Sequence, residues 1–548
     1  MVNESDAYVL EQSLSKQDNS NVFENKKWTY VTDSTSSNGA FSGQIQFDLS
    51  NLSNANQFTN LAESVITFPV KLSIKNTTGA APAACTVNAA TIKHGFHQFV
   101  DSVQIVLGGQ TIQSSQIYTN IDTNYKILTE WSEEQYNKLA PTLGLGGLDD
   151  ISPPNDAVMA ATSSLDNYGV VTTGEGLNLN ANLQNQGIKK RFQMFNNTSA
   201  ASLGKSILGT DQHVLGKSNV QVNAADATLG NDVFVLHALG TIRLCDISDA
   251  ISKLPLMKNL TGFIYLNYNS SVTTITNDTG ALTVDSYTSQ ASYGRCCPAA
   301  VNYSATGLHC KATGVAPVTF TADISAVASS TLTTAAVIQN NAILHAPYYS
   351  ATPEINRVLS MKKTIRYNER FVTEFNIAAN GSVNQTLTPG ISNPTRVILY
   401  PYFTGAGSSG NTFSSNPLLS PFDGCPSTTS PFASLKNFQL NVGNQPMFQS
   451  PINFDYQTFL NEVSPLGLDG GQDNKMTSGL LNQRSWNQLY RYYTVDVSRR
   501  LNSEDGASKS IQISCTNATT CPMRVIAIIH YQKEITVDTA SGQITQGM

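Results

Sequence analysis

A strand–turn–strand pattern occurs twice in this chain, once in each half. The first copy is Ser102-Val-Gln-Ile-Val-Leu-Gly-Gly-Gln110, and the second is Asn437-Phe-Gln-Leu-Asn-Val-Gly-Asn-Gln445, at a constant offset of 335 residues. Apolar and polar residues alternate before each turn, as in a β-strand with one buried face. Gly108-Gly109 and Gly443-Asn444 suit tight turns that need positive φ. The repeat predicts two hairpins in equivalent places of two similar units.

A short amphipathic helix is predicted after each hairpin. Apolar residues recur at helical spacing at Ile117, Ile121, Tyr125 and Leu128, and again at Tyr456, Phe459, Leu460 and Val463. We expect Pro141 to end the first helical region. Three copies of a chain with two similar units would place six alike units around a three-fold axis.

Most other patterned segments have the period of β-strands, and long helical patterns are nearly absent. In Gly39-Ala-Phe-Ser-Gly-Gln-Ile-Gln-Phe-Asp-Leu-Ser50, one side of the extended chain is apolar and the other polar. The further expected strands are 64–74, 232–236, 241–245, 262–268, 370–377, 395–400, 492–497, 511–513 and 524–531. A short helix containing Ile251 and Leu254 is also expected. The fold class is therefore predicted to be all-β with short helices.

The length of 548 residues exceeds what one hydrophobic core usually spans, so at least two domains are expected. Residues 1–38 are polar and unpatterned and are expected to form an N-terminal arm. The first β-unit is expected at 39–348 and the second at 349–548. Two weakly patterned stretches in the first unit, at about 142–230 and 270–340, are expected to be long insertions between strands.

The composition argues against a nucleic-acid-binding protein and against a secreted one. Only 13% of the residues are charged and the formal net charge is −6, so no strong field attracts a phosphate backbone. The N-terminus lacks the basic and apolar regions of a signal peptide, and no run of about 18 apolar residues suggests a membrane span. The eight cysteines are too few for a disulfide scaffold, so we expect free thiols in a reducing compartment.

Two Gly-Lys-Ser triplets resemble the end of a nucleotide-binding P-loop. That motif also needs a glycine five residues before the triplet's own glycine. Ser199 and Asp211 stand at that place before Gly204-Lys205-Ser206 and Gly216-Lys217-Ser218. Neither triplet has a strand-to-helix context, so we interpret both as ordinary loops.

The histidines and cysteines lack the spacing that metal or redox chemistry needs. His94 and His97 have no further ligand nearby, so histidines at a loop or strand end are expected rather than a metal site. Adjacent cysteines such as Cys296-Cys297 rarely bridge well, and Cys515 and Cys521 lack the CxxC spacing. Structural thiols are therefore expected.

The adjacent carboxylates Glu133-Glu134 and Asp149-Asp150 are poor candidates for an acid/base pair. Neighbouring side chains diverge on a strand and splay on a helix, whereas such catalysis needs facing groups. Solvated surface is expected, with calcium binding as the alternative. None of the seven histidines stands out as a general base. We therefore assign no catalytic, cofactor-binding or metal-ligating residue, and no cofactor.

Several blocks scattered over nearly the whole chain resemble the double jelly-roll major capsid proteins of the virophage and Polinton-like virus group of double-stranded DNA viruses. The blocks are Gly43–Leu49 with Phe68–Ile74, Arg243–Ser248 with Leu254-Pro255, Leu387–Pro394, 435–463, and Trp486 with Tyr490–Arg499. The resemblance implies two tandem eight-stranded jelly rolls standing perpendicular to a shell. It also implies that the insertions form outward-facing towers.

The same resemblance implies a non-enzymatic function in an icosahedral virion. The chain would form homotrimeric, pseudo-hexameric capsomers around double-stranded DNA, with a separate single jelly-roll penton protein and minor capsid proteins as further partners. Sequence-specific nucleic-acid binding is not expected. Small single jelly-roll capsid proteins commonly carry a basic arm, whereas residues 1–25 hold one lysine against several acids, namely Lys16 against Glu4, Asp6, Glu11, Asp18 and Glu24.

Two other classes of protein remain open at this point. A secreted or surface β-sandwich adhesin or lectin predicts a signal peptide and aromatic-lined sugar sites. A carbohydrate-active β-protein predicts a pocket with two acidic groups and clustered tryptophans, yet the chain has only Trp28, Trp131 and Trp486.

Overall fold

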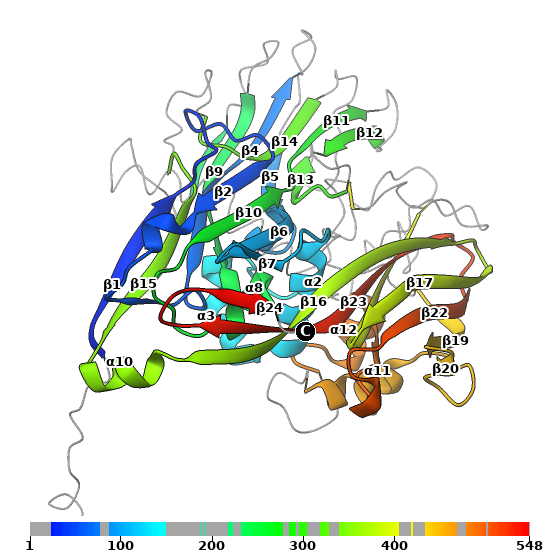
Figure 1. The fold of residues 1–548 in the computed structure, drawn as a ribbon. Helices are drawn as coiled ribbons and strands as arrows, with labels where there is room; N and C mark the ends of the chain where they lie inside the picture. Colours follow the sequence, from blue (N-terminus) through cyan, green and yellow to red (C-terminus); the bar gives the residue numbers. More distant parts are fainter. Residues whose placement is uncertain are drawn as a thin grey trace, which may run out of the picture.

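The protein was analysed as a computed structural model (Figure 1). The structure describes residues 23–76, 87–149, 187, 191, 218–222, 232–277, 284–291, 295–303, 318–327, 339–404, 418–419, 433–467, 478–499 and 502–546. Within these residues the chain forms two β-sandwiches joined by a short helix, α10 (Pro353–Leu359). We call them the first sandwich, which ends with β15, and the second sandwich, which begins with β16.

The first sandwich has two sheets of antiparallel strands. One sheet contains, side by side, β1 (Phe23–Thr32), β15 (Ile343–Ala351), β4 (Val65–Asn76) and β9 (Asp232–Arg243). The other has the order β2 (Gln44–Asp48), β10 (Gly262–Tyr268), β6 (Val100–Leu107) and β7 (Gln110–Gln113).

The second sandwich repeats this arrangement strand for strand. Its first sheet has the order β16 (Lys362–Ile377), β23 (Met523–Asp538), β18 (Pro394–Phe403) and β21 (Tyr493–Asp496). Its second sheet has the order β17 (Ser382–Ser392), β22 (Ser508–Asn517), β19 (Leu435–Val442) and β20 (Gln445–Pro446). When the eight strands of each sandwich are matched in chain order, the two sandwiches have the same strand neighbours. The repeat expected from the sequence is confirmed.

The two hairpins occupy equivalent edges, at the end of the four-stranded sheet in each sandwich. Both central residues of each turn have positive φ, 54° and 80° at Gly108 and Gly109 and 57° and 68° at Gly443 and Asn444. Positive φ at both positions is the geometry that joins two twisted strands most directly. The predicted helices follow, as α2 (Thr119–Glu130) and α11 (Tyr456–Val463).

Additional elements decorate this framework. Beside β4 the first sheet continues through β14 (Val318–Ile324), β11 (Ser271–Asn277) and β12 (Val284–Ala291), and it also holds β3 (Phe58–Thr59) and β8 (Ser218–Val222). β5 (Val87–Ile92) pairs with β13 (Ala299–Tyr303), and β24 (Ile544–Gln546) pairs with β23. The remaining helical turns are η1 (Leu49–Leu52), η2 (Phe96–Phe99), α3 (Glu133–Leu143), α8 (Leu244–Ile247), α9 (Asp249–Lys253), η4 (Ser464–Leu466), α12 (Gln483–Gln488) and η5 (Asn502–Glu504).

Three local expectations differ from the structure. Residues 23–32, expected to belong to an arm, form strand β1, and β15 runs past the expected boundary at 348 to Ala351. Pro141 does not end the helical region, because α3 contains it and ends at Leu143, before the left-handed Gly144. The stretch 270–340 does lie between β10 and β15, but its described residues include four strands rather than loop alone.

Each of the two hydrophobic cores includes side chains from the other sandwich. The core of the first sandwich includes Tyr367, Ile535, Val537 and Ile544 from the second half of the chain. The core of the second includes Tyr118, Ile121, Tyr125 and Leu128, from α2 and the residue before it. Figure 1 shows α2 between the sandwiches and the β23–β24 end of the chain reaching toward the first one. The two sandwiches are therefore packed as one body.

Candidate functional site

The seam between the two sandwiches holds the richest set of buried polar contacts described in this protein. Helix α2 of the first sandwich lies against the second, where the Tyr125 hydroxyl is 2.9 Å from the Thr494 hydroxyl. The Tyr125 ring also packs edge-on against Tyr492, at 5.1 Å between centroids, and Asn124 Nδ2 donates to the Tyr492 hydroxyl at 3.1 Å. The helix is thus anchored by aromatic packing and by hydrogen bonds.

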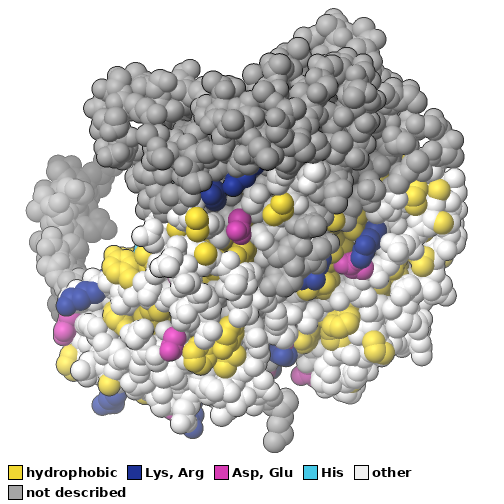
Figure 2. Space-filling model, turned by 90° about the horizontal axis from the view of Figure 1, so that it is seen from above, with side chains coloured by type: hydrophobic (Ala, Val, Ile, Leu, Met, Phe, Trp, Pro, Cys, Tyr) yellow, Lys and Arg dark blue, Asp and Glu magenta, His cyan; other side chains and the backbone are white. Residues whose placement is uncertain are grey.

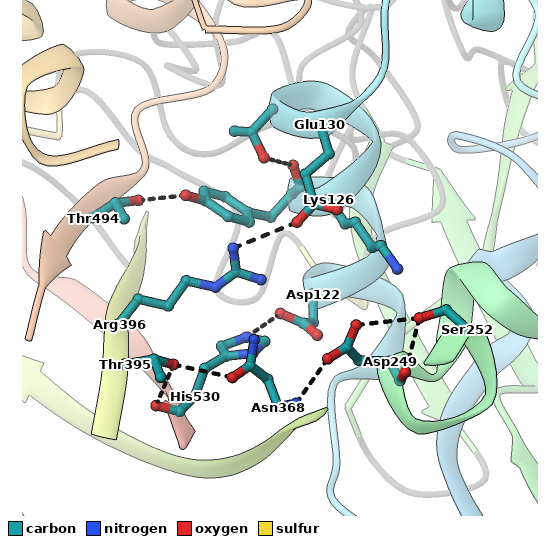
Figure 3. Close-up of polar contacts among 12 residues, drawn as sticks. Asp122, Lys126, Glu130, Asp249, Ser252, Asn368, Thr395, Arg396, Thr494 and His530 are labelled. Atoms are coloured by element: carbon teal, nitrogen blue, oxygen red, sulfur yellow. Dashed lines mark hydrogen bonds and ion pairs between the residues drawn. The ribbon is translucent and has the colours of Figure 1, made fainter. Parts of the chain in front are cut away.

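A carboxylate on α2 joins two strands of the second sandwich. Asp122 Oδ1 is 2.7 Å from Nε2 of His530 on β23 (Figure 3). Asp122 Oδ2 accepts from Nη1 of Arg370 on β16 at 3.1 Å. Burial alone would raise the pKa of Asp122, but His530, Arg370 and Arg396 together hold it well below its ordinary value. Burial lowers the pKa of His530 against the opposing effect of Asp122, and Nε2–H of His530 donates to the Asp122 carboxylate.

Arg396 on β18 lies beside this pair and faces α2. Its Nη1 donates to Glu130 Oε1 at 3.4 Å, and its guanidinium lies over the Tyr125 ring, 5.7 Å from the centroid. The positive charge is thereby held against one acid and one aromatic face, both from the first sandwich.

A second cluster bonds the hairpin of the first sandwich to β16. Glu369 is 3% exposed and accepts from the backbone N–H of Ser114 at 2.7 Å and from the Ser114 hydroxyl. Its other oxygen accepts from the Tyr531 hydroxyl at 2.8 Å and forms an ion pair with Lys533. Against the effect of burial, these donors lower the pKa of Glu369. Asp249 of α9 adds a further bond by accepting from the backbone N–H of Asn368 at 2.7 Å.

The end of the chain closes the seam from the other side. The backbone N–H of Lys258 donates to the Thr539 carbonyl at 2.8 Å, and Asn259 Nδ2 donates to the Ala540 carbonyl at 3.0 Å. The Tyr367 hydroxyl donates to the Ile112 carbonyl at 2.5 Å. The sandwiches are held together by contacts from both halves of the chain.

A cleft of about 330 Å³ opens between these clusters. Its lining combines five acids with basic side chains, namely Asp122, Glu130, Asp246, Asp249 and Glu369 with Lys126, Lys253, Arg370, Arg396 and His530. The Asp122–His530 pair resembles part of a hydrolytic triad, but Thr395 donates its hydroxyl to the His530 backbone carbonyl and not to the ring. The described geometry is that of a polar joint and supplies no aligned nucleophile.

The residues considered from sequence alone lie elsewhere. His94 and His97 are buried at η2, with ring centroids 5.9 Å apart, and burial lowers the pKa of His94 to about 4. Cys296, Cys297, Cys515 and Cys521 are buried free thiols, as expected of structural cysteines. Among the described residues no cluster of three or more potential metal ligands is present.

One carboxylate was misplaced by the sequence reasoning. Asp149, expected on the solvated surface, is fully buried and pairs with Arg191 at 2.5 Å. Glu134 is exposed and pairs with Lys138 at 2.5 Å, and Glu133 lies in the same first turn of α3. Asp150 and both triplets, apart from Ser218 at the start of β8, lie outside the described residues.

The strand order and the seam define a class of protein, the double jelly roll, in which two eight-stranded sandwiches with the same topology follow each other in one chain. No protein-family model and no curated protein matches this sequence. Among solved structures, the mavirus major capsid protein matches 98% of this chain and 93% of its own at 9% identity, with a TM-score of 0.51.

Two further solved structures cover nearly the whole chain. A capsid structure of the Sputnik virophage matches 96% of this chain and 89% of its own, at 11% identity and a TM-score of 0.49. PBCV-1 VP54 matches 97% of this chain and 99% of its own, at 10% identity and a TM-score of 0.42. The double jelly-roll fold rests on the mavirus match together with the strand order, and it confirms the predicted fold class.

Helices of the described residues are all too short or too polar to cross a bilayer.

Proposed function

We propose that this chain is the major capsid protein of a double-stranded DNA virus and that it assembles through copies of itself. The observation that carries the proposal is the double jelly-roll fold, which this chain shares with the mavirus major capsid protein over nearly its full length. The clefts and buried acids of the described residues show no aligned catalytic group, which favours a structural function over an enzymatic one.

The assembly unit that we propose is a homotrimer with a pseudo-hexagonal outline. Each chain contributes two sandwiches of equal strand order, so three chains offer six alike units around one axis. The polar seam favours this arrangement because it fixes the two sandwiches of one chain as a single building block. We also propose that the chain divides into its two jelly rolls near α10, with the first jelly roll before this helix and the second after it.

The low charge of the surface also supports assembly. Figure 2 shows few charged side chains on the described part of one face, some single and some beside an opposite charge, among uncharged and apolar atoms. Permanent interfaces bury about 2,000 Å² or more, and few charges means little cost of ion desolvation. Trimers would tile an icosahedral shell in the virion, with a separate penton protein at the vertices and minor capsid proteins as further partners.

The proposal is tested by the size and shape of the purified protein. We expect sedimentation at three times 59 kDa, and electron micrographs with six-lobed particles that associate into sheets or shells. A stable monomer that turns over or binds a glycan would contradict the proposal and favour an adhesin, a lectin or a carbohydrate-active β-protein.

A further inference from the structure

Strand β1 carries the two most exposed large aromatic side chains of the described residues. Trp28 is 47% exposed and Tyr30 is 63% exposed. Both lie on the side of the strand opposite to the buried Val31, and the Tyr30 ring meets that of His345 on β15 edge-on at 5.1 Å. We call the surface formed by Trp28, Tyr30 and His345 the β1 face. Large aromatic groups left in water at a sheet edge mark a surface that binds a partner.

The register of the two repeated sheets shows which part of the second sandwich corresponds to the β1 face. To align the two sheets, we start in each from the first residue of the third strand that pairs with the fourth strand. We then follow the paired residues across the other strands. The corresponding rows across the four strands are Tyr30, His345, Val65 and Arg243 in the first sandwich and Arg370, His530, Arg396 and Asp496 in the second. Tyr30 therefore corresponds to Arg370, and His345 corresponds to His530.

In the second sandwich this row is covered by the helix α2. Arg370 and His530 both bond to Asp122, and both side chains are 7% exposed. Helix α2 follows the hairpin β6–β7 of the first sandwich in the chain. We call this arrangement the contact rule. The segment that follows the hairpin of one sandwich packs on the first two strands of a sheet in the next sandwich, which here are β16 and β23.

We infer that the β1 face binds residues 447–467 of a second copy of this chain, the described segment after β20 that contains α11. This inference rests on the proposed trimer and deepens it. It applies the contact rule once more, because α11 follows the second hairpin as α2 follows the first. Contacts within and between chains then alternate, and three copies close a ring of six sandwiches.

The chemistry of the two surfaces fits a polar and aromatic contact. Helix α11 buries its apolar side in its own sandwich and leaves Gln457 and Asn461 exposed, joined by a hydrogen bond of 3.1 Å. Amide groups can bond to the hydroxyl of Tyr30 and to the indole N–H of Trp28. Gln457 and Asn461 are uncharged, unlike Asp122 on α2, so these two residues form no ion pair with the β1 face.

The first test introduces negative charge into the β1 face. The double variant Trp28→Glu and Tyr30→Glu should dissociate to monomers at concentrations where the parent is a trimer, with at least about a 100-fold loss of association and with an unchanged circular dichroism spectrum. The matched control is Val272→Glu with Val327→Glu, two apolar residues of the same sandwich that are 43% and 44% exposed. The control should stay trimeric.

The outcomes separate this inference from the proposed function. If the parent is trimeric and the double variant stays trimeric, the β1 face is not the interface, while the capsid proposal stands. If the parent itself is monomeric, both are wrong.

A second test identifies the partner surface directly. A photoreactive benzoylphenylalanine at position 30 should yield cross-linked dimers upon illumination, and mass spectrometry should find the attached peptide within residues 447–467. The same group at position 327 should not capture that peptide. Cross-links from position 30 to any other segment would overturn the assignment of α11 as the partner.

Discussion

Asp122 is a central side chain of the seam, because it bonds to two strands of the other sandwich. We expect Asp122→Asn to lower the free energy of unfolding by about 3 kcal/mol, since Arg370 loses its charged partner in a buried place. The matched control Glu134→Gln removes an exposed acid that pairs with Lys138 and should change stability by less than about 0.5 kcal/mol. Urea denaturation monitored by fluorescence measures both.

The pH dependence of this effect has a definite sign. The folded-state pKa of Asp122 lies well below its ordinary value, so its contribution is complete above about pH 4 and shrinks as the pH falls further. Parent and Asp122→Asn should therefore differ equally at pH 7 and pH 5. A difference that disappeared already at pH 5 would contradict the seam as described.

Asp323 on β14 gives the opposite prediction. Burial raises its pKa to about 6, against Lys71 and the backbone N–H of Ile324, so the ionised form costs stability in the folded state. The contribution of Asp323 to the free energy of unfolding therefore falls as the pH rises from about 4 to 6. Above about pH 6 the full cost of the buried charge is reached. Asp323→Asn should stabilise the protein at pH 8, by up to about 2 kcal/mol, and by about half as much at pH 5.

Thermal melts at the two pH values test this effect. Asp455→Asn is the control, because asparagine caps a helix as well as aspartate does and should leave α11 in place. Destabilisation of Asp323→Asn at pH 8 would show that the carboxylate is needed in its charged form.

At the scale of elements, strands in which apolar and polar residues alternate were predictable, and strands without this alternation were not. The two hairpins combine strict alternation with turns that accept positive φ, so their positions follow from local chemistry alone. Strand β1 was missed because Lys26, Lys27 and Trp28 are all exposed, which removes the alternation on which the prediction depends. Its pairing with β15, more than 300 residues away, holds it in place.

The start of β10 depends on a glycine. Gly262 has φ of +147°, and a Cβ there would overlap the carbonyl oxygen of Val106 on the neighbouring strand β6. Gly262→Ala should therefore cost at least about 3 kcal/mol. Gly109→Ala, at φ +80° with nothing within 4 Å, should cost only about 1 kcal/mol from the backbone strain.

Differential scanning calorimetry compares the two alanine variants. Equal thermal midpoints would mean that β10 and β6 can separate at this point without loss.

At the scale of the whole molecule, the seam lay beyond sequence reasoning. Its ion pairs join α2 to β16 and β23, which are about 250 and 400 residues further along the chain. No motif marks Asp122 or His530, because Asp122 is one of several polar residues at the start of its helix and His530 is a single polar residue after an apolar run. The equivalence of the two hairpins was the part of the architecture that the sequence did reveal.

The trimer should resist salt. If contacts between chains are apolar and hydrogen-bonded, raising sodium chloride to about 0.5 M should leave the sedimentation coefficient unchanged, because screening acts on exposed charges. Dissociation within this range would indicate that ion pairs between chains hold the assembly. Parallel runs of the Asp122→Asn variant would show whether a loosened seam makes the trimer sensitive.

The exchange of core residues across the seam has a consequence for synthesis. Ile544 belongs to the core of the first sandwich, although it lies near the last residue of the chain. The N-terminal sandwich therefore cannot be completed while the ribosome is still translating the second, even though domains elsewhere fold as they emerge. Its apolar surface stays incomplete until β23 and β24 have been synthesised, so the first sandwich reaches its native form only after most of the second has left the ribosome.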